Sequence, residues 1–256
     1  MKSILNYLHK KLDCFVIFTV PRSGSNLLCG CLNSHPEIIC HHELFHPQDI
    51  YYSLDHRDGD INYTIKARDK NPIQFICSVS RKKFGKKISG FKMMPGHNRE
   101  AEEYILKNKS IKKIILNREN KLKTFVSLKL AEKTNSYSSL KSANEKLNLC
   151  CREKIFIEYE ELKKNIQNVE SYFNRILNYL SGSKQKYFFI TYEDFSLTEG
   201  FSTKVELLNF LNVEPNPCLI QPRHVKQNPD DLSELIENYD ELAIKLQGTS
   251  LEKFFY

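Results

Sequence analysis

Residues 14–26 read CFVIFTVPRSGSN, an apolar run followed at once by a turn of small residues. The run from 14 to 20 is rich in β-branched and aromatic residues and has the length of a buried strand. Gly24 permits a tight turn, and Ser23 or Ser25 can cap the N-terminus of a helix. The stretch therefore predicts a strand, a short turn and a helix in direct succession.

The predicted helix runs from 25 to 33 and is ended by His35-Pro36. Such a corner can hold a phosphate or sulfate, because the N–H groups of the turn converge on the anion and the helix dipole favours negative charge. Arg22 adds a permanent positive charge. The turn lacks the first glycine and the lysine of the Walker loop, which disfavours a magnesium-dependent nucleotide kinase. An ordinary strand–helix corner with one exposed arginine is the plain alternative.

A second short strand, 37–40, is followed by three histidines and an acid. Ligands of open α/β sheets bind at the carboxyl ends of strands, so Glu43 is expected beside the anion loop. Its alternative role is a helix cap or an ion pair with a lysine. Zinc sites combine spaced ligand pairs from two segments. No distant pair accompanies His41, His42 and His46, so no metal is predicted.

A further apolar strand, 112–116, leads to Arg118, and a helix predicted over 120–133 carries Ser127. Arg118 stands at the end of the strand, and Ser127 lies two turns into the helix, where both can face one anion. Taken alone, the pair is better explained as an arginine at a strand end and an incidental helical serine. Its position after the first motif favours a shared site.

The two motifs together resemble those of sulfotransferases that use 3′-phosphoadenosine 5′-phosphosulfate (PAPS), above all bacterial carbohydrate sulfotransferases acting on trehalose or nodulation factors. The resemblance implies that Glu43 is the catalytic base, that Arg118 and Ser127 hold the 3′-phosphate, and that no metal is needed. It makes Lys226, in a late basic loop, a candidate donor contact, with a surface loop as the alternative. The resemblance implies these 5′-phosphosulfate contacts: Arg22, Ser23, Gly24, Ser25, Asn26 and Leu27.

Strands alternate with helices along the chain. This pattern predicts an α/β fold, a P-loop-like open and mainly parallel sheet with helices on both faces. One sulfotransferase domain is expected over 1–256, with residues 47–87 irregular. The remaining predicted strands are 88–94 and 187–191, and the remaining predicted helices are 98–108, 158–180, 203–211 and 231–246.

The composition is that of a folded protein, with 256 residues, 41% apolar and 27% charged. Lysine and arginine number 38 against 31 acids, and this net charge of +7 suits an anionic ligand. No nucleic-acid motif is present, so nucleic acid is not predicted as a partner. With no span of membrane length and no signal peptide, a cytoplasmic protein is expected, and its eight cysteines are interpreted as buried free thiols.

The sequence thus predicts a PAPS-dependent sulfotransferase that moves a sulfuryl group in line to a hydroxyl of a carbohydrate or glycoconjugate. The acceptor is a small molecule or a glycan. A nucleotide-dependent kinase with a degenerate P-loop and a non-catalytic nucleotide- or glycan-binding protein stay open as alternatives. The identity of the acceptor and the oligomeric state are not predicted.

Overall fold

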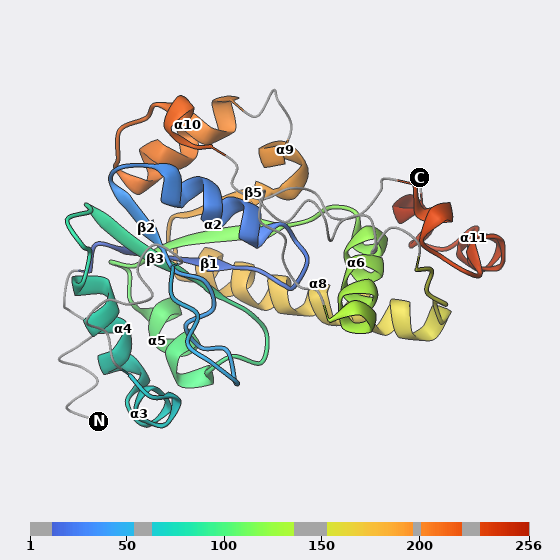
Figure 1. Cartoon of the computed structure of the whole chain (residues 1–256), viewed down its shortest axis with the longest axis horizontal. Helices are drawn as coiled ribbons and strands as arrows, with labels where there is room; N and C mark the ends of the chain where they lie inside the picture. The colour runs from blue at the N-terminus through green and yellow to red at the C-terminus, as the bar shows by residue number, and fades with distance from the viewer. Residues whose placement is uncertain (1–11, 54–62, 136–152, 197–200, 222–230, 256) are drawn as a thin grey trace.

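The structure, a computed structural model, describes residues 12–53, 63–135, 153–196, 201–221 and 231–255 (Figure 1). Its strands form one parallel sheet in the order β2-β3-β1-β4-β5, which confirms the predicted α/β fold. The strand that precedes the predicted anion loop, β1, lies at the centre of this sheet. The strands are β1 Cys14–Phe18, β2 Ile38–Cys40, β3 Ile88–Met93, β4 Lys112–Asn117 and β5 Tyr187–Thr191.

Helices cover both faces of the sheet, with α2 and α10 on one face and α4, α5 and α8 on the other (Figure 1). The α-helices are α2 Ser25–Ser34, α3 Ile65–Lys70, α4 Pro72–Arg81, α5 Arg99–Lys107, α6 Lys121–Thr134, α8 Tyr159–Gly182, α9 Tyr192–Ser196, α10 Phe201–Leu211 and α11 Tyr239–Leu246. Short 3-10 helices are η2 Pro217–Leu219, η3 Leu232–Glu234 and η4 Glu252–Phe254. None of the helices in the described residues is long and apolar enough to cross a membrane.

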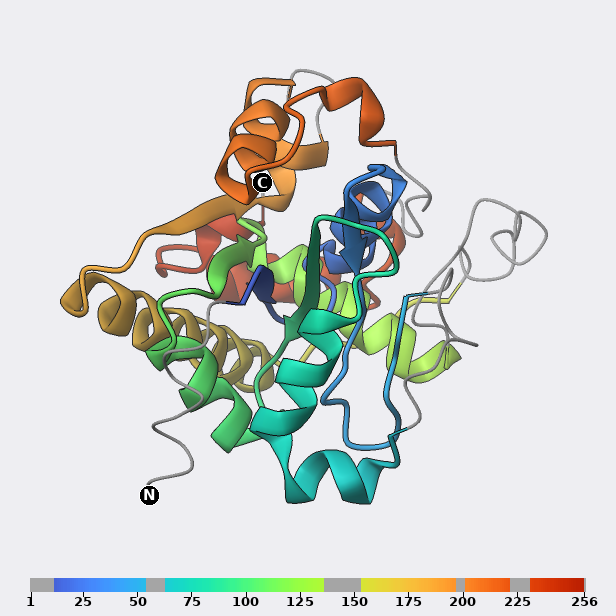
Figure 2. The ribbon, with the colours of Figure 1, turned by 90° about the vertical axis from the view of Figure 1, so that its left-hand side faces the viewer.

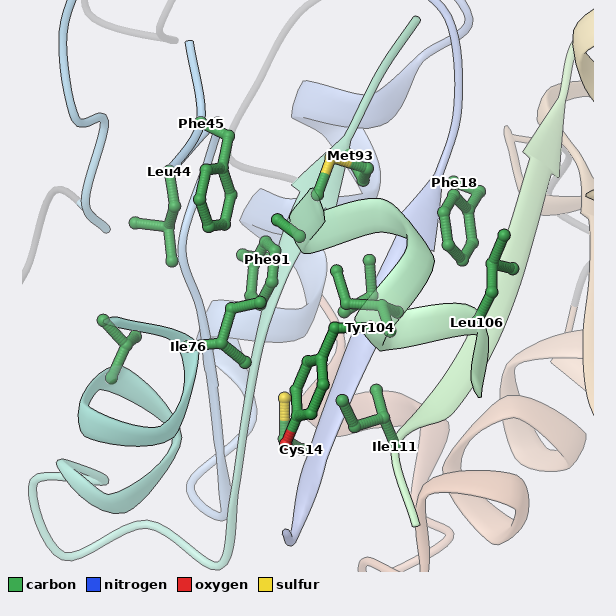
Figure 3. Close-up of a cluster of buried hydrophobic side chains, with 14 of the residues drawn as sticks. Cys14, Phe18, Leu44, Phe45, Ile76, Phe91, Met93, Tyr104, Leu106 and Ile111 are labelled. Carbon is green, nitrogen blue, oxygen red and sulfur yellow. The ribbon is translucent and has the colours of Figure 1, made fainter. Parts of the chain in front are cut away.

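Every residue of β1 is buried, because the sheet is covered on both sides. Phe15 and Ile17 pack toward α2 and α10, whereas Val16 and Phe18 pack toward α4, α5 and α8. Figure 3 shows the second of these cores, where Phe18 lies in one cluster with side chains of β3, α4 and α5. Helices on both faces therefore pack against β1 up to its carboxyl end, where the predicted anion loop begins.

A third apolar cluster joins α6 to the first half of α8 and to the C-terminal segment. There the predicted helix 231–246 is wrong, because the chain forms η3 and then α11 with a break between them. Ile155 explains the break: its N–H donates to the Leu235 carbonyl at 2.9 Å, and its carbonyl accepts from the Glu237 N–H at 2.8 Å. These bonds use backbone groups that a continuous helix would need internally.

The prediction that residues 47–87 are irregular is wrong, because α3 and α4 lie within them. Thr64 caps α3 by accepting from the Ala67 N–H, and Pro72 starts α4. The other predicted elements of the described residues agree with the structure within two residues at each end. Five cysteines are buried free thiols, as predicted, whereas the predicted burial is wrong for Cys218, which is exposed. Segments 136–152 and 222–230, including Lys226, lie outside the described residues.

Candidate active site

The turn between β1 and α2 is shaped by two left-handed residues, Arg22 with φ 65° and Gly24 with φ 84°. Glycine adopts this conformation without strain, whereas a residue with a side chain loses about 1–2 kcal/mol. Ser23 is buried inside the turn, where its hydroxyl donates to the Val20 carbonyl at 2.7 Å and shares a hydrogen bond with Thr19. The Ser23 side chain therefore stabilises the turn itself.

The N-terminus of α2 is uncapped, so the predicted capping by Ser23 or Ser25 is wrong. Gly24 occupies the N-cap position, no side chain of the described residues makes the capping bond, and no acid lies in the first turn. First-turn N–H groups have no acceptor within their own helix. In α2 they belong to Ser25, Asn26 and Leu27, while the Leu27 side chain packs against the apolar core. This helix end can receive an anion from solution.

The arginine side of the loop brings both sequence motifs together. Arg22 donates from Nε to Ser127 Oγ at 2.9 Å, although the two residues are 105 positions apart. Arg118 donates from Nη1 to the Arg22 carbonyl at 3.2 Å, and its guanidinium lies 4.8 Å from the centre of the Tyr192 ring. Two arginines and a hydroxyl thus gather beside the loop, a set suited to a phosphate group.

The end of β4 is held in place by two residues that sequence reasoning did not single out. Lys121 donates to the Asn117 side chain and to the Arg118 carbonyl, and burial lowers the pKa of Lys121 to about 8. The carboxylate of Glu193 accepts from the N–H groups of Glu119 and Asn120 at 2.9 and 3.4 Å. Both sets of hydrogen bonds hold the backbone at residues 118–120, which carries the Arg118 side chain.

The Tyr192 ring packs against the loop at Gly24. A Cβ atom placed on Gly24 would lie 2.2 Å from Cδ2 of this ring, which is well inside van der Waals contact. Tyr192 is therefore packed between Gly24 and Arg118. Tyr192 is the first residue of α9, and only the tertiary structure brings it against the loop.

The Gly24→Ala variant is expected to be less stable by about 1–3 kcal/mol, since it combines left-handed strain with a clash against Tyr192. It should also bind an anionic ligand more weakly, because the ring must move. Gly85→Ala is the matched control, with a φ of 79° but nothing within 4 Å of its new methyl group. Urea unfolding of the two variants measures the difference. Equal losses would show that the Tyr192 contact costs nothing.

The other side of the loop carries Glu43, whose Oε1 lies 3.1 Å from Lys92 Nζ. Lys92 lies next to the carboxyl end of β3 and is only 1% exposed. Its ammonium also donates to Asn26 Oδ1 at 2.7 Å and to Ser25 Oγ at 3.4 Å. Lys92 thus bridges Glu43 and the start of α2. The ion pair with a lysine considered from the sequence is present. It leaves Glu43 Oε2 to face another neighbour, His97, at 4.0 Å.

Lys92 was missed in the sequence, although a lysine within the apolar strand ISGFKMM is itself a signal. Burying a charged side chain costs so much free energy that a buried charge is normally found with a partner of opposite charge. The strand alone does not reveal the partner, because Glu43 and Asn26 reach Lys92 from two other segments.

His97 is a neutral neighbour of Glu43. Burial lowers its pKa to about 4. Its Nδ1 lies 3.2 Å from the Met94 N–H and accepts from it, so the ring proton is placed on Nε2, the nitrogen that faces Glu43. The positive charge beside Glu43 at neutral pH therefore comes from Lys92 and not from His97.

Acid should destabilise the protein through His97. Its folded-state pKa is below the ordinary value of 6.5, so the folded chain binds fewer protons at this site and stability falls as the pH drops from 6.5 toward 4. Between pH 6.5 and 4.5 the expected loss is about 2 kcal/mol. The His97→Asn variant should lose correspondingly less over this range in urea titrations. Parallel pH curves for the two proteins would contradict this prediction.

The structure therefore assembles Glu43, the loop residues 22–27, Arg118 and Ser127 around the carboxyl ends of β1, β3 and β4. His41 is buried away from this group, with its Nδ1 accepting from the Ser53 N–H at 3.1 Å. Among the described residues, no group of three or more His, Cys, Asp and Glu side chains is placed to hold a metal ion.

Comparison with known proteins gives a similarity to solved structures. No protein-family model matches the chain, and no curated protein matches it. Among solved structures, the chain is similar to the crystal structure of a sulfotransferase from Alicyclobacillus acidocaldarius, at 17% sequence identity over 93% of this chain and 94% of that chain, with a TM-score of 0.43. A likeness of this size assigns no function, so the function has to come from the site itself.

Proposed function

We propose that this protein is a sulfotransferase that moves a sulfuryl group from PAPS to a hydroxyl of a carbohydrate or glycoconjugate. The observation that carries the proposal is the hydrogen bond from Arg22 to Ser127, because it joins the anion loop and the second motif in one site. Glu43 and Lys92 stand on the other side of the same loop.

Two sets of groups at the loop would match the two charged groups of the donor. The N–H groups of α2 and the charge of Arg22 would hold the 5′-phosphosulfate. Arg118 and Ser127 would hold the 3′-phosphate, which PAPS carries and ATP lacks. The Tyr192 ring keeps the Arg118 guanidinium beside the loop. Selection of PAPS over ATP would therefore depend on Arg118.

Glu43 would act as the general base that takes the proton of the acceptor hydroxyl. As this proton leaves, the acceptor oxygen forms a bond to sulfur, and the bond from sulfur to the bridging phosphate oxygen breaks in line with it. The electron pair stays on adenosine 3′,5′-bisphosphate. Arg22 and the N–H groups of the loop would stabilise the negative charge on this leaving group. Lys92, which lies between Glu43 and the loop, would neutralise charge on the sulfuryl oxygens.

Transfer of labelled sulfate from PAPS to a panel of sugars and glycolipids tests the proposal, with mass spectrometry of the product. A sulfated sugar formed equally well in EDTA is the expected result. Turnover of ATP that strictly requires Mg²⁺ would favour the kinase alternative. Nucleotide binding without transfer to any acceptor would favour a binding protein and overturn the proposed function.

A further inference from the structure

Glu43 lies at the start of a closed loop, residues 42–51, whose two ends are hydrogen-bonded to each other. The His42 N–H donates to the Tyr51 carbonyl at 3.0 Å, and the Tyr51 N–H donates to the Glu43 carbonyl at 3.3 Å. In Figure 2 the light-blue chain after β2 descends from the sheet to the level of α3. This loop, here called the Glu43 loop, belongs to neither a helix nor a strand.

Arg68 of α3 supplies the hydrogen-bond donors that the inner carbonyls of the Glu43 loop need. Its Nη1 donates to the carbonyls of Leu44 at 3.0 Å, His46 at 2.8 Å and Asp49 at 3.2 Å. Its Nε and Nη2 donate to the two carboxylate oxygens of Asp69 at 2.8 and 3.1 Å. The Arg68 side chain is only 2% exposed. Without Arg68, the carbonyls that it contacts would lose their donor in a buried place, which would cost free energy of folding.

Apolar packing holds the same loop from the sheet side. The Phe45 ring lies 5.5 Å from that of Phe75 on α4 and 6.0 Å from that of Phe91 on β3, and the Arg68 guanidinium lies 5.6 Å from the centre of the Phe45 ring. Figure 3 shows Leu44 and Phe45 in the cluster that holds Phe91 and Ile76. Leu44 directly follows Glu43 in the chain, and Phe91 directly precedes Lys92. Both members of the Glu43–Lys92 ion pair are therefore next to a residue that is packed in this cluster.

We propose that Arg68 is a positioning residue that keeps the Glu43 carboxylate beside Lys92 and in reach of the acceptor hydroxyl. The inference rests on the proposed role of Glu43 as the base. Arginine suits this task because its planar fork can donate to several carbonyls and a carboxylate at once, whereas lysine offers a single point charge. The segment 63–81, which carries no catalytic group in our assignment, thereby acquires a function in supporting the site.

The test compares Arg68→Met and Arg68→Lys with the wild-type protein. Arg68→Met should lower kcat by about 10- to 100-fold, because a misplacement of about 1 Å is sufficient for such a loss. The affinity for adenosine 3′,5′-bisphosphate, measured by calorimetry, should stay within about twofold of wild type, since Arg68 touches no residue of the anion loop. Arg68→Lys should restore part of kcat. Hydrogen exchange at the amides of His42, His46 and Tyr51 should become faster in Arg68→Met.

Lys113→Met is the matched control, because it also removes a buried cation that supports backbone. Lys113 donates to the Asn108 carbonyl at 2.6 Å and to Gln185 Oε1 at 2.7 Å, and neither acceptor belongs to the site. The control should lose stability but keep kcat per folded molecule. A wild-type kcat in Arg68→Met, or an equal loss in Lys113→Met, would overturn the positioning role.

Hydrogen exchange separates a failure of this inference from a failure of the proposed function. A wild-type protein that transfers no sulfate refutes the proposed function alone. Exchange in the Glu43 loop needs no substrate, and unchanged exchange in both Arg68 variants would refute the positioning role whether or not sulfate is transferred. Should Arg68→Met fail to fold, Arg68→Lys still provides both readouts.

Discussion

Replacement of Glu43 by glutamine is expected to lower kcat by ~10²- to 10⁴-fold, the usual effect of losing a general base. Glutamine keeps the size and polarity of the side chain but has no basic oxygen. The affinity for adenosine 3′,5′-bisphosphate should stay near wild type, because the loss concerns the transfer step. Measuring kcat and calorimetric affinity on the same folded preparation tests both parts.

Loss of the Glu43–Lys92 ion pair complicates this variant, because a buried ammonium is left beside a neutral amide. The variant should therefore also be less stable, and its kcat must be expressed per folded molecule. If Glu43 only pairs with Lys92, stability falls while turnover stays intact. In that case Glu43 is not the base, and His42 becomes the next candidate. His97 does not suit this role, because its nitrogen that faces Glu43 already carries the ring proton.

Arg22→Ala provides the contrasting variant. Arg22 is proposed to touch the donor before and during transfer, so its loss should weaken donor binding as well as the rate. Loss of the bond to Ser127 should add to this effect. A lower kcat with unchanged donor affinity would show that Arg22 contacts the donor only in the transition state, and unchanged affinity together with an unchanged kcat would place Arg22 outside the donor site.

Replacement of Arg118 by methionine should weaken the binding of adenosine 3′,5′-bisphosphate by about 10²-fold, as expected when one partner of a close charge pair is removed. In the wild-type protein this ligand should raise the melting temperature far more than adenosine 5′-phosphate does. In Arg118→Met the two nucleotides should become nearly equal. Ser127→Ala should show the same change to a smaller extent, since one hydrogen bond contributes about 1 kcal/mol.

Adenosine 5′-phosphate is the internal control for this experiment. Arg118 also donates to the Arg22 carbonyl, so its loss could disturb the anion loop itself. Unchanged affinity for the 5′-phosphate would show that the loop is intact and that the lost contact is with the 3′-phosphate. Equal melting shifts for both nucleotides in the wild-type protein would remove the case for a 3′-phosphate site.

The sequence alone determined those features that depend on neighbours along the chain. An apolar run, a turn with Gly24 and a helix ended by His35-Pro36 are local patterns, and the observed β1 and α2 match them. Asn120 caps α6 by accepting from the Lys123 N–H, as its position before an apolar helix predicts. The alternation of strands and helices was sufficient to predict the parallel sheet.

Only the tertiary structure decided which distant side chains meet. Arg68 stands in sequence as an ordinary cation, and Lys92 stands within an apolar strand without a visible partner. The partners are found only in the fold, where Glu43 meets Lys92 and the carbonyls of the Glu43 loop surround Arg68. The break between η3 and α11 likewise depends on Ile155, which binds there from another segment. Local patterns express the preferences of the backbone, whereas a buried charge or a broken helix is stabilised by partners that the fold brings from far along the chain.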